Sequence, residues 1–201
     1  MTNKLPLIIV CGLGNQGSHY IWLSRNFAAR QRGIDYDRVE AKNVQSQAHT
    51  LMGMGQGKVP ALTQMMQGLF GFRMEGVQRK IEAVNVAALL GEADLVVDCL
   101  DNWTARKIIT EFTREQGIPC VHAGLDQNGT YGHVVWDGHF RIEGQDGAEQ
   151  EATCEDGENL PFNVSVAAEL TQAVQRWLRD GTRMQSTVTL AGIRRDFLSP
   201  K

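Results

Sequence analysis

Short apolar runs alternate with segments of helical periodicity along the first two thirds of the chain. Residues 7–11 (LIIVC) form a continuous apolar run of strand length, and a helix-compatible stretch follows from His19 to Arg32. A second run at 94–99 precedes a stretch with apolar residues at helical spacing from Thr104 to Gln116, and a third run occupies 118–123. This alternation predicts a doubly wound α/β fold, a mostly parallel sheet with helices on both faces.

The last third of the chain has a different pattern. Residues 130–136 and 139–142 alternate between apolar and polar positions around an Asp-Gly dipeptide, which predicts a tight hairpin and an antiparallel extension of the sheet. Residues 143–160 are acidic and contain almost no apolar side chains, so we expect a flexible crossover loop there. Helical spacing then predicts a helix from Pro161 to about Arg179, and a short strand follows at 186–191.

Length and composition narrow the class of protein. The 201 residues suit a single domain, and 42% apolar residues with only 5 prolines exclude a mostly disordered chain. The formal net charge of −3 lacks the basic excess on which nucleic-acid binding relies. No apolar run approaches the roughly 18 residues of a membrane span. The 4 cysteines form no C-x-x-C pair, which favours a reducing, cytoplasmic compartment.

A glycine-rich turn joins the first predicted strand to the first predicted helix. Gly12, Gly14 and Gly17 have the spacing that lets backbone N–H groups and a helix N-terminus approach a phosphate. About twenty residues further on, Asp35 or Asp37 supplies the acid that a ribose hydroxyl would need. The pattern therefore predicts nucleotide binding. The alternatives are a turn that only packs a helix on a strand, and solvated loop carboxylates.

Three further motifs follow the glycine turn in order. They are D-Y-D-R-V-E-A-K-N-V-Q-S-Q at 35–47, M-G-Q-G-K-V at 54–59 and D-C-L-D-N-W-T-A-R at 98–106. Together with the glycine turn they resemble, over residues 7–136, the motifs of the ThiF/MoeB/HesA family, the adenylyltransferase relatives of ubiquitin-activating enzymes. The resemblance implies a Rossmann-like nucleotide-binding domain over 1–201, in a minimal member that lacks the family's zinc-binding cysteines.

The resemblance also implies a reaction. Family members use MgATP to adenylate a carboxylate, usually the C-terminal glycine of a ubiquitin-like or sulfur-carrier protein, with loss of pyrophosphate. Lys58 would be the catalytic lysine that meets charge on the α-phosphate, and Asp101 would bind Mg²⁺. The residues implied to bind the nucleotide are Gly12, Gly14, Gly17, Asp35, Asn43, Lys58, Asn102 and Arg106.

Each of these assignments has a plainer alternative. Lys58 is otherwise a solvated lysine of a glycine-rich loop, and Asp101 otherwise caps the helix that begins near Thr104. Arg106 lies where it would steady Asp101 or a phosphate. His122 lies in a predicted strand, where a histidine is more often a packed core residue than a functional one.

The chain departs from the family pattern at its charges and its cysteines. Ser46 stands where the family has an arginine that contacts the triphosphate, so adenylation is either weakened or supplied with charge from elsewhere, such as Arg73, Arg79 or Lys80. Cys154 lies in the acidic crossover loop, where thioester-forming family members have a catalytic cysteine. It is either the acceptor of the activated carboxylate or a remnant, because its acidic neighbours disfavour a thiolate.

Three functions therefore stay open on the sequence. The first is an ATP-dependent adenylyltransferase that forms a homodimer and acts on a carrier protein. The second is a catalytically degenerate, nucleotide-binding partner subunit, which Ser46 supports. The third is a nicotinamide-binding oxidoreductase, in which Lys58 and Asp101 have no obvious place.

Overall fold

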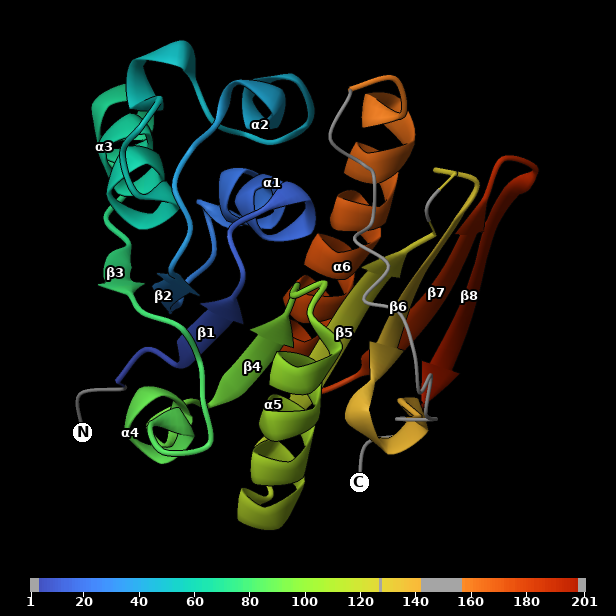
Figure 1. Ribbon diagram of the computed structural model, residues 1–201. Helices are drawn as coiled ribbons and strands as arrows, with labels where there is room; N and C mark the ends of the chain where they lie inside the picture. Colours follow the sequence, from blue (N-terminus) through green and yellow to red (C-terminus); the bar gives the residue numbers. More distant parts are fainter. Residues whose placement is uncertain (1–3, 127, 142–156, 199–201) are drawn as a thin grey trace.

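The computed structural model describes residues 4–126, 128–141 and 157–198 and places the eight strands found there in one sheet (Figure 1). The strands are β1 (Leu7–Cys11), β2 (Arg30–Asp35), β3 (Glu75–Gln78), β4 (Leu95–Asp98), β5 (Cys120–Leu125), β6 (Tyr131–Trp136), β7 (Arg183–Thr189) and β8 (Gly192–Leu198). The helices are α1 (Asn15–Ser24), α2 (Ala41–Ser46), α3 (Lys58–Phe70), α4 (Val86–Leu90), α5 (Trp103–Gln116) and α6 (Leu160–Asp180), with 3-10 turns η1 (Leu51–Gly53) and η2 (Asp137–His139). In this described part of the chain, no helix combines the length and the hydropathy needed to cross a membrane.

The sheet has a parallel and an antiparallel part. Its order is β3-β2-β1-β4-β5-β6-β7-β8, in which the first five strands run parallel and β6, β7 and β8 run antiparallel to their neighbours. The predicted doubly wound class with an antiparallel C-terminal extension is thus confirmed. The chain leaves β1 toward β2 and β3 on one side, and continues with β4 and β5 on the other. At such a switch point the loops diverge and leave a crevice at the carboxyl ends of the strands.

Helices cover both faces of the parallel part, and the side chains of β1 show why. All of them are buried. Ile8 and Val10 pack with residues of α1, α3 and α6, whereas Leu7, Ile9 and Cys11 pack with residues of α4 and α5. Figure 1 shows α5 in front of the sheet and α6 behind it. A strand that is covered on both faces needs a continuous apolar run, which is the pattern that the sequence has there.

The first helix is shorter than the predicted stretch of 19–32. It ends at Ser24, and the polar segment that follows is β2, the second parallel strand. Arg30 and Arg32 of β2 both form ion pairs with Glu75 on the neighbouring β3. Cross-strand pairing therefore allows a polar segment to occupy a place in the sheet that usually holds apolar residues.

The predicted hairpin around the Asp-Gly dipeptide is wrong. Asp137 and Gly138 begin η2 instead, and β6 pairs with β5 and β7. The carboxylate of Asp137 accepts a hydrogen bond from Arg114 Nε of α5 at 3.0 Å, which holds the chain against the helix rather than along β6. The strand that continues the sheet beyond β6 comes from the C-terminal end of the chain.

The predicted elements near the C-terminus are largely confirmed. The helix expected from Pro161 is α6, with the proline in its first turn and Gly181 as its left-handed C-cap. The strand expected at 186–191 is β7, which begins earlier, at Arg183. The exposed strand β8 was not predicted. Most of the crossover loop expected at 143–160 lies outside the described residues.

We expect Gly17→Ala to destabilise the protein strongly. A Cβ at Gly17 would lie 1.8 Å from the carbonyl oxygen of Gly12, so the turn would have to open at a cost of about 3 kcal/mol. Gly68→Ala is the matched control, because a Cβ at this glycine of helix α3 would meet nothing within 4 Å. Urea denaturation should show a lower midpoint for Gly17→Ala alone. Equal midpoints would contradict the tight packing of this turn.

Candidate functional site

The glycine turn between β1 and α1 lies at the switch point of the sheet. Gly12 has a φ of +87°, and a Cβ there would lie 2.9 Å from Leu100 Cδ2, so the turn packs directly on the segment that follows β4. Gly14 is the N-cap of α1, whose first turn contains neither an acidic residue nor a side-chain cap. The positive end of this helix dipole therefore suits a phosphate.

Asp35, at the end of β2, contacts the glycine turn directly. Its Oδ2 accepts a hydrogen bond from Leu13 N at 2.6 Å, and its Oδ1 accepts one from Asp37 N at 2.8 Å. Burial raises the pKa of Asp35, and the charge of Lys58 and the two N–H groups oppose that rise. Of the two candidate acids, Asp35 is the one beside the glycines. Each oxygen keeps a lone pair that can accept a hydrogen bond from a ribose hydroxyl. Binding of a ribose by Asp35 stays a prediction.

Helix α2 holds Asn43 and Ser46, and both are buried. Asn43 Oδ1 accepts a hydrogen bond from Glu40 N at 2.9 Å and completes a capping box at the start of the helix. This bond gives Asn43 a structural role, and its contact with a phosphate stays a prediction. The hydroxyl of Ser46 has no partner among the described residues. The position where the family resemblance places an arginine is therefore an interior one.

His49 also contacts the glycine turn, and no motif in the sequence indicated it. Its Nε2 lies 2.9 Å from Leu13 O. Because a carbonyl only accepts, Nε2 holds the proton of the neutral ring, and Nδ1 finds no partner among the described residues. Burial lowers the pKa of His49 to about 4, and the nearby Lys58 and His19 act in the same direction.

Lys58 is the first residue of α3 and is buried, so it is not a solvated loop lysine. Its Nζ lies 3.2 Å from Asp37 Oδ2, and its backbone N–H donates to Asp37 O at 2.8 Å. The ion pair with Asp37 places the ammonium just beyond the end of β2, and its charge lowers the pKa of Asp35. The structure thus joins the lysine of one motif to the acidic residues of another.

The segment after β4 contains Asp101 and Asn102. Asn102 Oδ1 accepts a hydrogen bond from Ala105 N at 3.0 Å, so Asn102 is the N-cap of α5. The alternative role of Asp101 as a helix cap is therefore wrong, whereas the predicted start of the helix near Thr104 is confirmed, because α5 begins at Trp103. Asp101 is exposed and makes no hydrogen bond or ion pair within the described part of the chain. Its carboxylate is open to a ligand.

The fit of Asp101 to a magnesium ion follows from its surroundings. Mg²⁺ is commonly bound by one or two carboxylates together with phosphate oxygens and water. In residues 4–126, 128–141 and 157–198, no group of three or more His, Cys, Asp or Glu side chains could hold a metal ion. Asp101 therefore suits an ion that arrives with a nucleotide, rather than a site made of protein ligands alone.

Arg106 contacts interior groups instead of the partners expected for it. Its Nε donates to Asp98 Oδ2 at 2.9 Å, and its Nη2 donates to Ala123 O at 3.0 Å. The expectation that Arg106 steadies Asp101 directly is wrong, because the carboxylate that it binds is that of Asp98. A contact between Arg106 and a phosphate stays a prediction.

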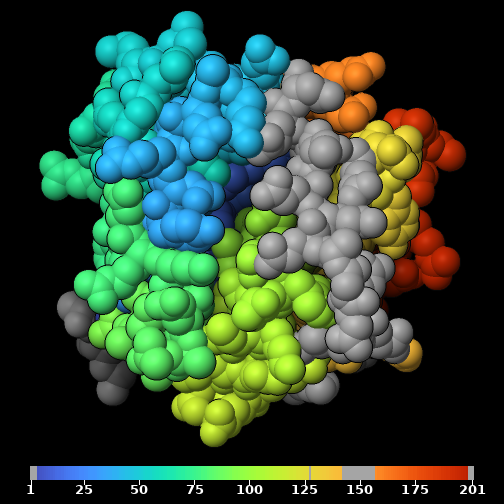
Figure 2. Space-filling model, in the orientation of Figure 1, coloured from blue at the N-terminus to red at the C-terminus, as the bar shows by residue number. Residues whose placement is uncertain are grey.

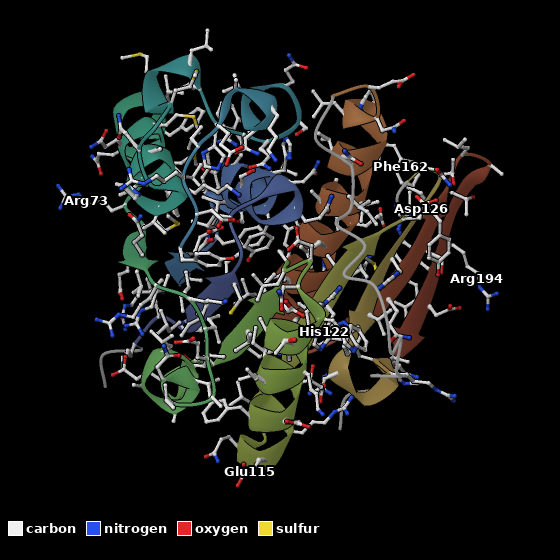
Figure 3. All side chains as sticks on the ribbon, in the orientation of Figure 1. Arg73, Glu115, His122, Asp126, Phe162 and Arg194 are labelled. Carbon is white, nitrogen blue, oxygen red and sulfur yellow. The ribbon has the colours of Figure 1, made fainter. Side chains whose placement is uncertain are left out.

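The remaining candidates lie in different places. Arg73 is exposed, and Figure 3 shows it at the outer edge of the molecule, beyond α3. Arg79 is also exposed. The Nζ of Lys80 lies 5.6 Å from the centroid of the Tyr36 ring, beside the carboxyl end of β2. Lys80 is thus the best placed of the three to add charge near the site. Cys154 lies outside the described residues.

Most of the predicted residues gather around one turn. Gly12 packs on the segment that precedes Asp101, and Leu13 binds both Asp35 and His49. Figure 2 shows a hollow between the light-blue segment that includes α2 and the yellow-green region of α5, with dark-blue atoms of the N-terminal part at its base. This arrangement can hold a nucleotide phosphate between a helix N-terminus, a buried ammonium and an open carboxylate.

Comparison with known proteins agrees with this geometry. The model of the ThiF family matches residues 8–168, and the chain therefore belongs to the ThiF family. It is 29% identical over 121 residues to the SAMP-activating enzyme E1 of Haloferax volcanii, and 27% identical over 127 residues to the sulfur carrier protein adenylyltransferase of Thermus thermophilus. These matches cover 59% and 62% of this chain but 45% and 47% of the relatives, so the chain spans about half of their length.

Solved structures share the fold. The structure of E. coli MccB with ATP superposes with a TM-score of 0.75 at 13% identity, and the match covers 98% of this chain and 64% of that one. The structure of PaaA gives a TM-score of 0.73 at 17% identity, and its match covers 97% and 64%. At such low identity the likeness establishes a Rossmann-type fold and nothing finer.

The buried His49 gives the stability of the protein a defined pH dependence. Its pKa is lowered from 6.5 to about 4 by folding, so the unfolded chain binds the proton more tightly. His49 therefore contributes stability above pH 6.5 that is lost as the pH falls toward 4. We expect the free energy of unfolding of the wild type to fall over this range by about 3 kcal/mol more than that of His49→Gln.

Urea denaturation at a series of pH values measures this difference. His139→Gln changes an exposed histidine of η2 and should leave the slope as it is in the wild type. Identical slopes for the wild type and His49→Gln would show that folding leaves the pKa of His49 unchanged.

Proposed function

We propose that this protein uses ATP and Mg²⁺ to adenylate a carboxylate, namely the C-terminal glycine of a ubiquitin-like or sulfur-carrier protein. Membership of the ThiF family supports the reaction. The names of two relatives, a SAMP-activating E1 and a sulfur carrier protein adenylyltransferase, support a carrier protein as the substrate. The observation on which the proposal rests is Lys58, whose buried ammonium lies at the start of α3 and pairs with Asp37, two residues beyond the end of β2.

In the proposed step, an oxygen of the substrate carboxylate attacks the α-phosphorus of ATP. The bond from that phosphorus to the oxygen bridging to the β-phosphorus breaks, pyrophosphate leaves with the bonding electrons, and an acyl adenylate remains. Negative charge builds on the α-phosphate during the attack. Lys58 and the N–H groups at the start of α1 would stabilise this charge, because the fold fixes them before the reaction begins.

Two carboxylates would hold the other parts of the nucleotide. Asp35 would bind the ribose hydroxyls at the end of β2, and the phosphates would then extend over Gly14 toward Asp101. Asp101 would hold the magnesium ion, which neutralises part of the phosphate charge when bound. The exposure of Asp101 and the absence of any ion pair to it from another described residue support this role.

We also propose that the protein is a homodimer, as the resemblance to the ThiF/MoeB family implies. Leu51, Met52 and Met54 are exposed just before Lys58, and such apolar side chains are suited to cover by a partner. Light scattering should therefore give twice the chain mass of 22.3 kDa. A mass of one chain at micromolar concentration would exclude the dimer.

A catalytically degenerate partner subunit is the second candidate, and Ser46 favours it. The side chain of Ser46 is completely buried, so it offers no contact to a triphosphate. If Lys80 does not supply the missing charge, ATP would bind without being turned over. The two candidates therefore differ in catalysis and not in binding.

Calorimetry and pyrophosphate exchange test these functions together. We expect ATP with Mg²⁺ to bind better than NAD, because Lys58 and Asp101 recognise a triphosphate with its metal ion. Exchange of labelled pyrophosphate into ATP should then depend on an added carrier protein. Preference for NAD would overturn the proposal in favour of an oxidoreductase. ATP binding without exchange for any carrier would leave the degenerate subunit.

Lys58→Ala should separate catalysis from binding. Loss of one fixed charge contact commonly lowers the rate by about 10²–10³, whereas affinity for the ground state falls only several-fold. Exchange assays and calorimetry on the same preparation measure both effects. Lys107→Ala is the control, because Lys107 is an exposed lysine of α5 whose ion pair is with Glu111. Equal losses of rate and affinity would mean that Lys58 only binds the nucleotide.

A further inference from the structure

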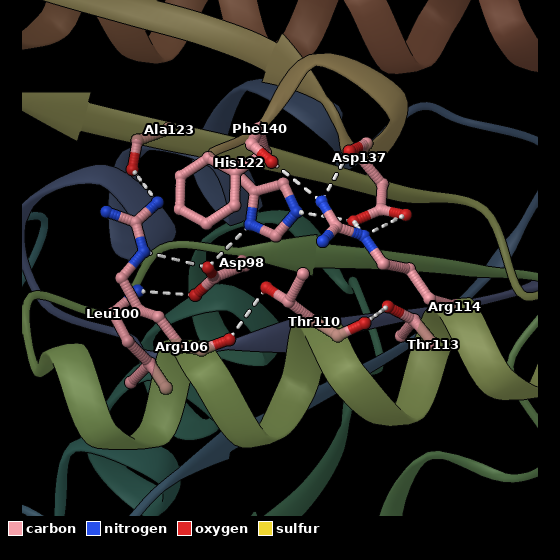
Figure 4. Close-up of polar contacts among 10 residues, drawn as sticks. All are labelled: Asp98, Leu100, Arg106, Thr110, Thr113, Arg114, His122, Ala123, Asp137 and Phe140. Carbon is pink, nitrogen blue, oxygen red and sulfur yellow. Dashed lines mark hydrogen bonds and ion pairs between the residues drawn. The ribbon is translucent and has the colours of Figure 1, made fainter. Parts of the chain in front are cut away.

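A buried row of charged groups lies between α5 and the sheet (Figure 4). Asp98, at the carboxyl end of β4, is fully buried, and its Oδ2 accepts hydrogen bonds from Arg106 Nε at 2.9 Å and His122 Nδ1 at 2.8 Å. His122 pairs with Asp98 in the register of β4 and β5 and is also fully buried. On its other edge, Nε2 lies 3.6 Å from Asp137 Oδ1, and Asp137 is bound in turn by Arg114.

Phe140 covers the imidazole of His122. The two rings are stacked with their centroids 3.9 Å apart and their planes 8° from parallel. The guanidinium of Arg106 lies 5.0 Å from the centroid of the same phenyl ring, and Arg114 Nη2 donates to Phe140 O at 2.6 Å. The stacked phenyl ring and the hydrogen bond from Nδ1 to Asp98 therefore fix the orientation of His122.

The charges of the row alternate in sign. Burial raises the pKa of Asp98, but Arg106 and His122 lower it to about 2, so Asp98 is a carboxylate at neutral pH. Burial lowers the pKa of His122, but the carboxylates of Asp137 and Asp98 raise it well above its usual value, so His122 is an imidazolium. Each buried charge thus has a neighbour of opposite sign, which offsets the cost of removing it from water.

The same carboxylate holds the segment that contains Asp101. Asp98 Oδ1 accepts a hydrogen bond from Leu100 N at 3.1 Å, and Leu100 directly precedes Asp101. Because two cations fix Oδ2, Oδ1 faces Leu100 in a single orientation. Asp101 has no side-chain partner in the described part of the chain, so its position depends on the backbone of this segment.

We propose that His122 is a positioning residue for the magnesium site: by holding Asp98, it fixes the segment 99–102 and so sets the affinity for the cation that Asp101 binds. This inference rests on the proposed function, in which Asp101 is a metal ligand. His122 acts through Asp98 and not on the substrate. Its removal should therefore change cation affinity more than the rate at saturating Mg²⁺.

Two substitutions separate the two edges of the imidazole. In His122→Asn the amide nitrogen can take the place of Nδ1 and still donate to Asp98. In His122→Gln the amide reaches the place of Nε2, and Asp98 loses this donor. Both variants lose the ring and the positive charge, so they are matched except at the edge that they preserve. His139→Gln replaces an exposed histidine and is the control for the effect of a histidine-to-glutamine substitution as such.

Hydrogen exchange at the Leu100 amide, followed by NMR without nucleotide, reports the positioning directly. We expect exchange about tenfold faster in His122→Gln than in the wild type, and within about threefold of the wild type in His122→Asn. The Mg²⁺ concentration that gives half-maximal ATP binding should rise about tenfold in His122→Gln alone. Thermal midpoints recorded beside these measurements show whether both variants are folded.

Unchanged exchange at Leu100 in His122→Gln would overturn the proposal, and so would equal acceleration in the two variants, which would indicate a purely structural role. If the wild type binds no ATP, the proposed function fails, and exchange at Leu100 still decides whether His122 positions the segment. If His122→Gln does not fold, Asp137→Asn replaces it. That variant removes the carboxylate charge 3.6 Å from Nε2, and a Leu100 amide as protected as in the wild type would then overturn the proposal.

Discussion

The close approach of Gly17 to the carbonyl oxygen of Gly12 is the constraint on which the candidate site depends. Only a chain without a Cβ at Gly17 can close the turn this tightly. The closed turn presents the N–H of Leu13 to Asp35 and its carbonyl to His49, so one backbone unit fixes two side chains from different motifs. The site is therefore organised around the backbone of the turn, and its side chains are secured to that backbone.

Charge burial is the second organising feature, and the fully buried Asp98 on the α5 face is the example that bears on the site. A buried carboxylate such as Asp98 is stable only when cations and N–H donors surround it, and removal of one partner usually costs more than the pair itself contributes. Arg106, His122 and the Leu100 N–H surround Asp98. An apolar side chain would pack there at less electrostatic cost. The charged arrangement instead fixes geometry, because each hydrogen bond has a preferred direction.

An element could be predicted from the sequence when the residues that stabilise it lie within the same segment of the chain. Strand β1 and helix α6 could be predicted because the spacing of apolar residues within each segment is enough to indicate the element. Strand β2 did not follow, because Arg30 and Arg32 are stabilised by Glu75, far away in the chain. In the site, the resemblance to the ThiF/MoeB family indicated Lys58 and Asp101, but not which residue caps α5. That choice depends on the hydrogen bond from Ala105 N to the neighbouring side chain.

The ion pair of Lys58 with Asp37 connects the resting structure to the proposed chemistry. The side chain of Lys58 is 9% exposed and that of Asp37 is 47% exposed, so water already solvates much of the carboxylate. Because water can solvate the half-exposed carboxylate, a phosphate can take the place of Asp37 beside Lys58 without leaving a buried anion unpaired. Without a phosphate, Asp37 gives the buried ammonium of Lys58 a partner of opposite charge. In the proposed function, Asp37 would therefore be an exchangeable partner that holds Lys58 in place until the phosphate arrives.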